Sequence, residues 1–315
     1  MTILKADLTR DTIQMLDQFK GCLLGAAMGD ALGMARESTP PDFQRLHEGY
    51  RRAWRGHPNA GLKPGRFTDD TQMMLLVAGM LVGGTYSEQG YAAALARMYM
   101  NEELRFPDAA VDAACRRLLL SGEQLGGVAS NTAGCISISI PFALAYSDPV
   151  DVTERVVQAC SVTHTHPAAH AGAVTVAMLV HYAVRGRPDA LSLAEKHAGL
   201  EDITLGNKIR AAVRLANEGI SLESALSVIG NDVTVYQTVP LAFFLIHRIR
   251  DVSVLLNTAA HVGGNTDTIA FICGAYAGAT YGKSALPRDL LEGLEGRDAI
   301  ESMAARLYER YITKP

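Results

Sequence analysis

The sequence predicts an all-α protein, a compact multi-helix bundle that forms one domain over residues 1–315. Apolar residues recur at helical spacing along most of the chain, whereas the period-two alternation of half-buried strands is scarce. No strand–helix–strand rhythm appears, and no linker with a clear change of composition divides the chain. With 48% hydrophobic residues, the chain can bury a large core.

Charge and cysteine usage exclude several classes of function. The net charge of −4 opposes general binding to nucleic acid or membrane surfaces. The five cysteines lie in apolar runs without CxxC spacing, as reduced core cysteines of intracellular proteins do. The start of the chain lacks a signal-peptide pattern, and the longest apolar tract, residues 171–184, is too short to cross a bilayer. We therefore expect a cytoplasmic protein with no nucleic-acid or membrane partner; its oligomeric state is open.

The first predicted helix, at residues 12–33, carries a glycine at every fourth position from Gly21 to Gly33. In a soluble chain, such a row forms a groove where another helix or a ligand backbone approaches closely. The phosphate-binding pattern GxxxxGK[ST] is absent, so the row favours helix packing over nucleotide binding. Residues 38–66, rich in Pro, Arg and His, have weak periodicity and are expected to form a surface excursion or lid.

The rest of the chain continues with helices joined by polar segments. Residues 122–133 are expected to form a Gly/Ser/Asn loop, and the stretch before residue 205 is read as polar connection. Apolar periodicity predicts further helices at 73–80, 87–100, 108–120, 135–146, 150–161, 168–184, 208–217, 222–229, 239–250, 252–261, 269–281 and 290–311.

Two glycine-led loops each bring Thr and Asp side chains to the start of an apolar helix. One contains Thr68, Asp69 and Asp70, and the other contains Asp267 and Thr268. Helix capping explains either cluster taken alone. The two together favour an oxygen-rich site for Mg²⁺ or Mn²⁺, which prefer carboxylate and hydroxyl ligands. Two such loops could hold two ions about 3.5–4 Å apart, bridged by a water molecule.

Four motifs, in this order, resemble those of the ADP-ribosylglycohydrolase family. They are Gly29-Asp-Ala-Leu-Gly-Met-Ala-Arg-Glu37, Phe67-Thr-Asp-Asp-Thr71, Thr163-His-Thr-His-Pro167 and Gly263-Gly-Asn-Thr-Asp-Thr268. The resemblance covers residues 21–282. It implies a helical domain with two Mg²⁺ or Mn²⁺ ions in a central cleft. It also implies hydrolysis of an N- or O-ribosyl glycosidic bond in ADP-ribosylated substrates.

The resemblance also assigns roles to individual residues. Glu37, Asp69 and Asp267 become catalytic, and Asn131 and His164 become substrate-binding. The implied metal ligands are Thr68, Asp69, Asp70, Asn265, Asp267 and Thr268.

Two positions depart from the family pattern. Asn265 stands where an acid is usual, so the site has one negative charge fewer. Residues 130–136 lack the arginine usual in this loop, a side chain suited to phosphate or ribose. These departures give weight to a small ribosyl nucleoside or nucleotide as the substrate. A non-enzymatic binding protein on the same fold is a further alternative, opposed by retention of both clusters and of Glu37. No zinc site is expected around His164, His166 and His170, because no further ligand completes it.

Overall fold

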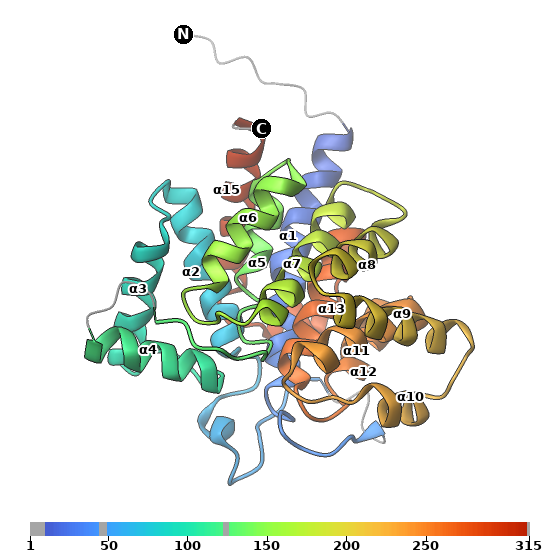
Figure 1. Cartoon of the computed structure of the whole chain (residues 1–315). Coiled ribbons are helices and arrows are strands. Elements are labelled where there is room, and N and C mark those ends of the chain that lie inside the picture. Colours follow the sequence, from blue (N-terminus) through green and yellow to red (C-terminus); the bar gives the residue numbers. More distant parts are fainter. Residues whose placement is uncertain (1–9, 44–48, 122–125, 314–315) are drawn as a thin grey trace.

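The computed structural model describes residues 10–43, 49–121 and 126–313, and this part of the chain is helical, with no strand (Figure 1). The prediction of a single all-α domain is confirmed, because one continuous core joins side chains from α1 through α15. The α-helices are α1 (Arg10–Gly33), α2 (Asp69–Gly83), α3 (Glu88–Met100), α4 (Ala109–Ser121), α5 (Ser139–Ala145), α6 (Pro149–Cys160), α7 (Pro167–Val184), α8 (Ala190–Glu201), α9 (Ile203–Asn217), α10 (Leu222–Ile229), α11 (Val235–Arg248), α12 (Val252–Ala259), α13 (Thr266–Tyr281), α14 (Arg288–Gly293) and α15 (Arg297–Thr313).

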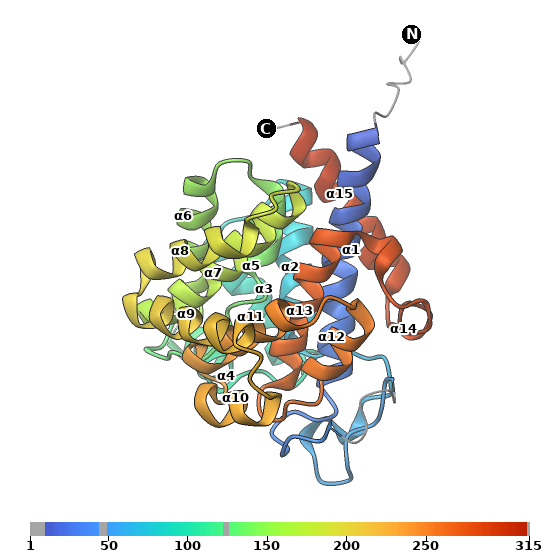
Figure 2. The same cartoon turned by 90° about the vertical axis from the view of Figure 1, so that its right-hand side faces the viewer.

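Helices α1 and α13 lie side by side at the centre and run antiparallel (Figures 1 and 2). The glycine row of α1 faces α13 along this whole contact. Gly21 and Gly25 meet Gly278 and Gly274, and further along Gly29 meets Ala270. A Cβ atom at any of these α1 glycines would overlap backbone atoms of α13. The row is therefore a helix-packing surface, as the sequence indicated.

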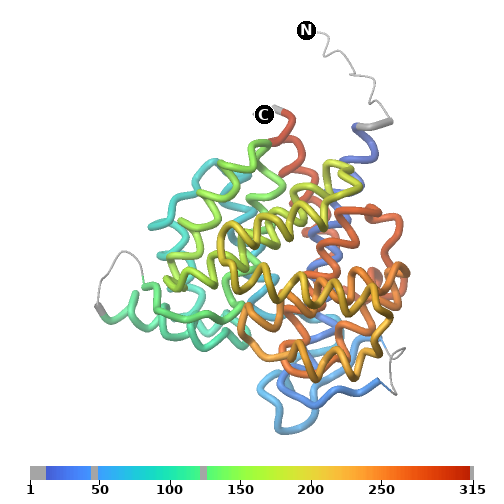
Figure 3. The backbone as a smooth tube through the Cα atoms, turned by 45° about the vertical axis from the view of Figure 1, so that its right-hand side comes forward, coloured from blue at the N-terminus to red at the C-terminus, as the bar shows by residue number. Residues whose placement is uncertain are grey.

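The segment after α1 covers the end of the molecule opposite both termini (Figure 3). It is tied to the loop before α13 by backbone hydrogen bonds. Ser38 N donates to Gly264 O at 2.7 Å, and Gly264 N donates to Thr39 O at 3.0 Å. Its only regular element among the described residues is a 3₁₀ turn, η2 (Pro58–Gly61). The expected surface excursion at 38–66 is confirmed for the described part; residues 44–48 lie outside it, as do 122–125 of the expected 122–133 loop.

Two expectations for secondary structure were wrong. The stretch read as polar connection contains helix α8, whose buried face carries only alanines: Ala190, Ala194 and Ala198. Alanine gives little hydrophobic contrast, so the helical period was not visible in the sequence. The single closing helix expected at 290–311 is instead two helices, α14 and α15, separated at Gly296, which has a left-handed φ of 64°.

Helix α7 is long and apolar enough for a membrane span by length and composition alone, but 83% of it is buried inside the protein. A core helix of this kind meets the same criteria. The five cysteines are all buried and unpaired, as expected for reduced core residues.

We predict that Gly25→Ala lowers the free energy of unfolding by about 2 kcal/mol or more, because the added methyl group overlaps the Gly274 backbone. The matched control is Gly79→Ala in α2, where the nearest atom to the new Cβ is Met303 Cε at 3.6 Å. That change should stabilise the protein by about 0.4–1 kcal/mol by restricting the unfolded chain. Urea unfolding of both variants measures the difference, and equal stabilities would contradict the close-contact role of Gly25.

Candidate active site

The start of helix α2 is fixed by a buried acid from α1. The Asp30 carboxylate is fully buried and accepts four hydrogen bonds. Thr68 donates its backbone N–H and its hydroxyl to Asp30, and Thr71 donates the same two groups, all between 2.6 and 3.1 Å. Burial raises the pKa of Asp30 and these four donors oppose the rise. The four groups that contact the carboxylate within hydrogen-bond distance are all donors, and they stabilise its charged form against the effect of burial. Asp30 thus sets the position of Asp69 and Asp70.

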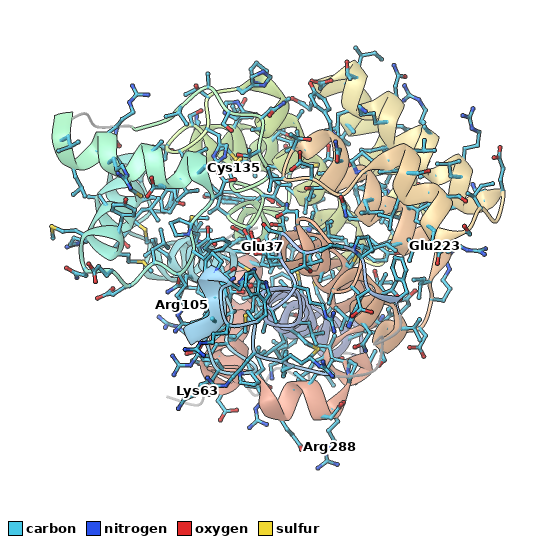
Figure 4. The ribbon with its side chains drawn as sticks, turned by 90° about the horizontal axis from the view of Figure 1, so that it is seen from below. Glu37, Lys63, Arg105, Cys135, Glu223 and Arg288 are labelled. Carbon is cyan, nitrogen blue, oxygen red and sulfur yellow. The ribbon has the colours of Figure 1, made fainter. Side chains whose placement is uncertain are left out.

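The two predicted acid clusters face one cleft of about 500 Å³. Asp69 and Asp70 enter it from the first turn of α2, and Asp267 and Thr268 enter from the first turn of α13. Glu37, just beyond α1, completes the acidic wall and lies near the middle of the view in Figure 4. The lining residues are Glu37, Ser38, Asp69, Asp70, Phe106, Pro107, Asp108, Ala109, Asp112, Thr132, Gly134, Val233, Asn265, Asp267 and Thr268.

Simple helix capping does not account for the two clusters. Thr68 and Asn265 occupy the N-cap positions of α2 and α13, yet neither side chain makes a capping hydrogen bond. The Thr68 hydroxyl is bonded to Asp30 instead, and Thr68 is absent from the cleft wall. Its expected role as a metal ligand stays a prediction.

The cleft acids are buried without a described cation beside them. Asp69, Asp70 and Asp267 are each 5% exposed or less, and none of the ion pairs between described residues involves them or Glu37. Burial raises the pKa of Asp69 and Asp70, and repulsion from the neighbouring acids raises it further. A cleft that concentrates uncompensated carboxylates favours a bound cation.

Asn265 has its amide orientation fixed by Thr238. The Thr238 hydroxyl donates to Asp232 O at 2.9 Å, so it can only accept from Asn265 Nδ2, also at 2.9 Å. The Asn265 Oδ1 atom therefore points to the acidic side, where Thr268 Oγ1 lies 3.3 Å away. The Thr268 hydroxyl donates to Asp70 Oδ2 at 2.9 Å, which links the two clusters directly.

Glu37 is held by residues of the surface excursion that the sequence did not single out. Asn59 N donates to His57 Nδ1 at 3.0 Å, so His57 Nε2 carries the proton and donates to Glu37 O at 2.8 Å. Asn59 Nδ2 contacts Glu37 Oε2 at 3.4 Å. Burial raises the pKa of Glu37, as do the charge of Asp267 and a hydrogen bond between the two carboxyl groups.

The predicted substrate residues Asn131 and His164 do not line the cleft. Asn131 O accepts a hydrogen bond from Val235 N at 3.0 Å, which ties its loop to the start of α11. His164 is fully buried, with Nε2 3.0 Å from Thr132 Oγ1 and 3.6 Å from Asp108 Oδ1. His164 thus supports two residues that do line the cleft. Contact of Asn131 or His164 with substrate stays a prediction.

The His164–Asp108 contact affects the pKa of both side chains. Burial lowers the pKa of His164, but the nearby Cys135 and the Asp108 carboxylate reverse that change and raise it. A hydrogen bond with Cys160, together with burial, raises the pKa of the Cys135 thiol, which is therefore uncharged at neutral pH. The charge that favours protonated His164 is accordingly that of Asp108.

Two cleft residues that the sequence did not single out, Phe106 and Asp108, lie beside Asp69. Arg105 O accepts from Asp69 N at 2.9 Å and Asp108 N approaches Asp69 Oδ2 at 3.4 Å, so Phe106 between them is held at the wall. Phe106 has a left-handed φ of 51°, which costs about 1–3 kcal/mol in a non-glycine residue. Asp108 also accepts from Ala110 N at the start of α4, so in the sequence it looks like an ordinary cap.

A family model described as ADP-ribosylglycohydrolase matches residues 11–315. The chain belongs to the ADP-ribosylglycohydrolase family. ADP-ribosylhydrolase ARH3 of Danio rerio is 27% identical over 348 residues, covering 95% of this chain and 92% of that protein. ADP-ribosylarginine hydrolase Tri1 of Pseudomonas putida is 28% identical over 309 residues, covering 94% of this chain and 79% of that protein. A solved structure, an ADP-ribosylglycohydrolase-related protein complex, superposes on this chain with a TM-score of 0.76 at 25% identity. The match covers 95% of this chain and 99% of that one.

We predict that Asp30→Asn lowers the free energy of unfolding by about 3 kcal/mol, because an amide nitrogen then faces N–H and O–H donors. The control is Asp148→Asn, since Asp148 is an exposed cap of α6 and Asn caps as well as Asp. Chemical unfolding of both variants measures the effect. If the two substitutions lower the free energy of unfolding by the same small amount, Asp30 is merely a helix cap and does not hold α2.

Proposed function

We propose that this protein is a hydrolase that cleaves the N- or O-ribosyl glycosidic bond of ADP-ribosylated substrates and depends on divalent metal ions. Membership of the family supports hydrolysis of ADP-ribosyl bonds, and the named relatives are hydrolases of this kind. The observation that carries the metal proposal is the meeting of three buried aspartates and the half-buried Glu37 at one cleft, with no described cation to compensate them.

The donors present fit Mg²⁺ or Mn²⁺. Asp69 and Asp70 offer carboxylates from α2, and Asp267 offers one from α13. The Thr268 hydroxyl and the Asn265 amide oxygen add neutral oxygen donors, as hard cations accept. Among the described residues, no three His, Cys, Asp or Glu side chains are grouped to hold one ion. Each proposed ion would therefore depend on these neutral donors and on water molecules as well as on carboxylates.

The residues of the cleft can take different roles in hydrolysis. When bound, the ions would orient the ribose hydroxyl groups and acidify a water molecule. Glu37, positioned by His57 and Asn59, can hold or accept a proton close to the scissile bond. Asp108 and Thr132, which also line the cleft, offer an acceptor and a hydroxyl group to the ribose. The half-buried Phe106 ring restricts water on one side of the cleft.

A second candidate is a hydrolase of small ribosyl nucleosides or nucleotides. No Lys or Arg side chain is among the described residues that line the cleft, and Thr132 and Gly134 stand on its wall in the loop that lacks an arginine. The wall therefore offers a diphosphate no cationic side chain, which favours a substrate with less negative charge.

We predict that the purified protein releases free ADP-ribose from an arginine- or serine-linked ADP-ribosyl peptide in Mg²⁺ or Mn²⁺, and that EDTA abolishes release. Mass spectrometry of the products measures both. Asp69→Asn and Asp267→Asn should each lower the rate by at least about 100-fold, the scale of losing a principal electrostatic group. The control is Asp112→Asn, a cleft acid already bonded to Tyr99 and Arg116. Unchanged turnover in protein shown to be metal-free would exclude the metal proposal; cleavage of nucleosides alone would favour the second candidate.

We predict that Asn265→Asp binds Mn²⁺ more tightly, because a further carboxylate contributes up to about 4 kcal/mol of attraction at an effective dielectric of 20, before desolvation. The gain should be partial, since Thr238 must turn its hydroxyl away from Asp232 O to satisfy the new oxygen. Asn207→Asp adds the same charge at an exposed position of α9 outside the cleft wall and serves as control. Calorimetric Mn²⁺ titration compares the three proteins, and wild-type affinity in Asn265→Asp would place this residue outside the metal coordination.

A further inference from the structure

Arg105, in the segment between α3 and α4, holds the start of helix α2, although it does not line the cleft (Figure 4). Its backbone O accepts a hydrogen bond from Asp69 N at 2.9 Å, and its backbone N donates to Gln72 Oε1 at 2.8 Å. Its guanidinium reaches the residue before the helix, because Nη1 donates to Phe67 O at 3.0 Å. One residue thus contacts the chain on both sides of Asp69.

The Arg105 guanidinium is fixed in turn by Glu295, which lies between α14 and α15. Nη1 lies 2.6 Å from Oε2 and Nη2 lies 3.0 Å from Oε1, so the pair is bidentate. The two side chains are only 23% and 24% exposed. Two parallel hydrogen bonds fix the plane of a guanidinium as well as its position. Because the same Nη1 donates to Phe67 O, Glu295 fixes the group that binds the start of α2.

Glu295 is itself attached to the loop that precedes α2. Its backbone N donates to Gly65 O at 2.9 Å. Gly65 has a left-handed φ of 82°, and a Cβ atom there would overlap Gly293 O at the end of α14. The C-terminal part of the chain therefore meets this loop by backbone contact, and the pair of Glu295 with Arg105 extends that contact to α2.

Asp69 depends on the Arg105 segment for the position of both its backbone and its carboxylate. Asp30 binds the neighbouring threonines of α2, whereas the Asp69 N–H group donates to Arg105 O. Three residues after Arg105, Asp108 N lies 3.4 Å from Asp69 Oδ2. A shift of the segment that Glu295 anchors would therefore move an acid of the cleft.

We propose that Arg105 and Glu295 are positioning residues of the active site. Glu295 holds the guanidinium, and Arg105 holds Asp69 in the orientation that metal binding and hydrolysis require. The effect on metal binding and rate rests on the proposed function, whereas the fixing of the Asp69 backbone does not. A misplacement of about 1 Å can cost an enzyme about 100-fold in rate, so this pair matters to a reaction that it does not touch.

Glu295→Gln tests the pair, and Glu301→Gln is the matched control. Glu301 lies in α15, its side chain is also 24% exposed, and it is likewise bonded to two cations, Lys20 and Lys283. Hydrogen exchange of the Asp69 amide, followed by NMR, should be at least about tenfold faster in Glu295→Gln than in the wild type, because its acceptor is no longer held. In Glu301→Gln this amide should exchange as in the wild type.

Metal binding and kinetics connect the pair to the reaction. In Glu295→Gln, Mn²⁺ titrated calorimetrically into the full-length protein should bind at least about threefold more weakly. The kcat for release of ADP-ribose should fall at least about tenfold, with KM changed less than about threefold, because the pair lies outside the cleft wall. Arg105→Gln and the double variant should show the same losses as Glu295→Gln, since the two residues act through one another.

The variants also give the outcomes that would overturn the proposal. Wild-type exchange of the Asp69 amide in Glu295→Gln would show that the pair does not hold this residue. Recovery of Mn²⁺ affinity in the double variant would assign the loss to the released charge of Arg105. Equal losses in Glu301→Gln would assign it to general destabilisation. If the wild type neither binds Mn²⁺ nor hydrolyses the substrate, the proposed function fails, and exchange of the Asp69 amide still decides whether the pair positions it.

Discussion

The close approach of α1 and α13 is the constraint on which the active site depends. Glycines on both helices let the two backbones touch, and a methyl group at Gly25 or Gly29 would separate them. At one end of this contact, Gly33 packs on the first turn of α13, and Thr266 donates a hydrogen bond to Gly33 O at 2.9 Å. The chain leaving α1 and the acid at the start of α13 are therefore brought together by backbone contact.

Asp30 extends this constraint to α2, whose first turn carries Asp69 and Asp70. It lies on the same helix as the glycine row and holds the start of α2 through four hydrogen bonds. One helix thus fixes both loops that carry Thr–Asp clusters, and Thr268 bonded to Asp70 closes the arrangement. Bringing buried carboxylates this close is costly unless something compensates their charge. The close packing of small residues at the centre holds these acids together, and the divalent cations that we propose would compensate their charge.

Much of this arrangement could be predicted from the sequence, for identifiable reasons. The glycine spacing predicted close helix packing, and the repeated Thr–Asp pattern predicted one shared acidic site. Asp30 could have been singled out, because a charge inside an apolar, glycine-rich helix needs a partner. Asp108, His57 and Asn59 could not, since Asp108 looks like an ordinary cap and the other two lie in an irregular segment. Their roles depend on contacts between residues far apart in the chain.

The central claim is that the two clusters form one metal-binding catalytic cleft. The most direct measurement is a crystal structure of the protein with Mn²⁺ and ADP-ribose, using anomalous scattering to locate the metal. We expect anomalous peaks coordinated by Asp69 or Asp70 of α2 and by Asp267 of α13, with the ribose of ADP-ribose beside them and near Glu37. Anomalous density absent from this cleft, with ADP-ribose bound elsewhere on the protein, would contradict the account.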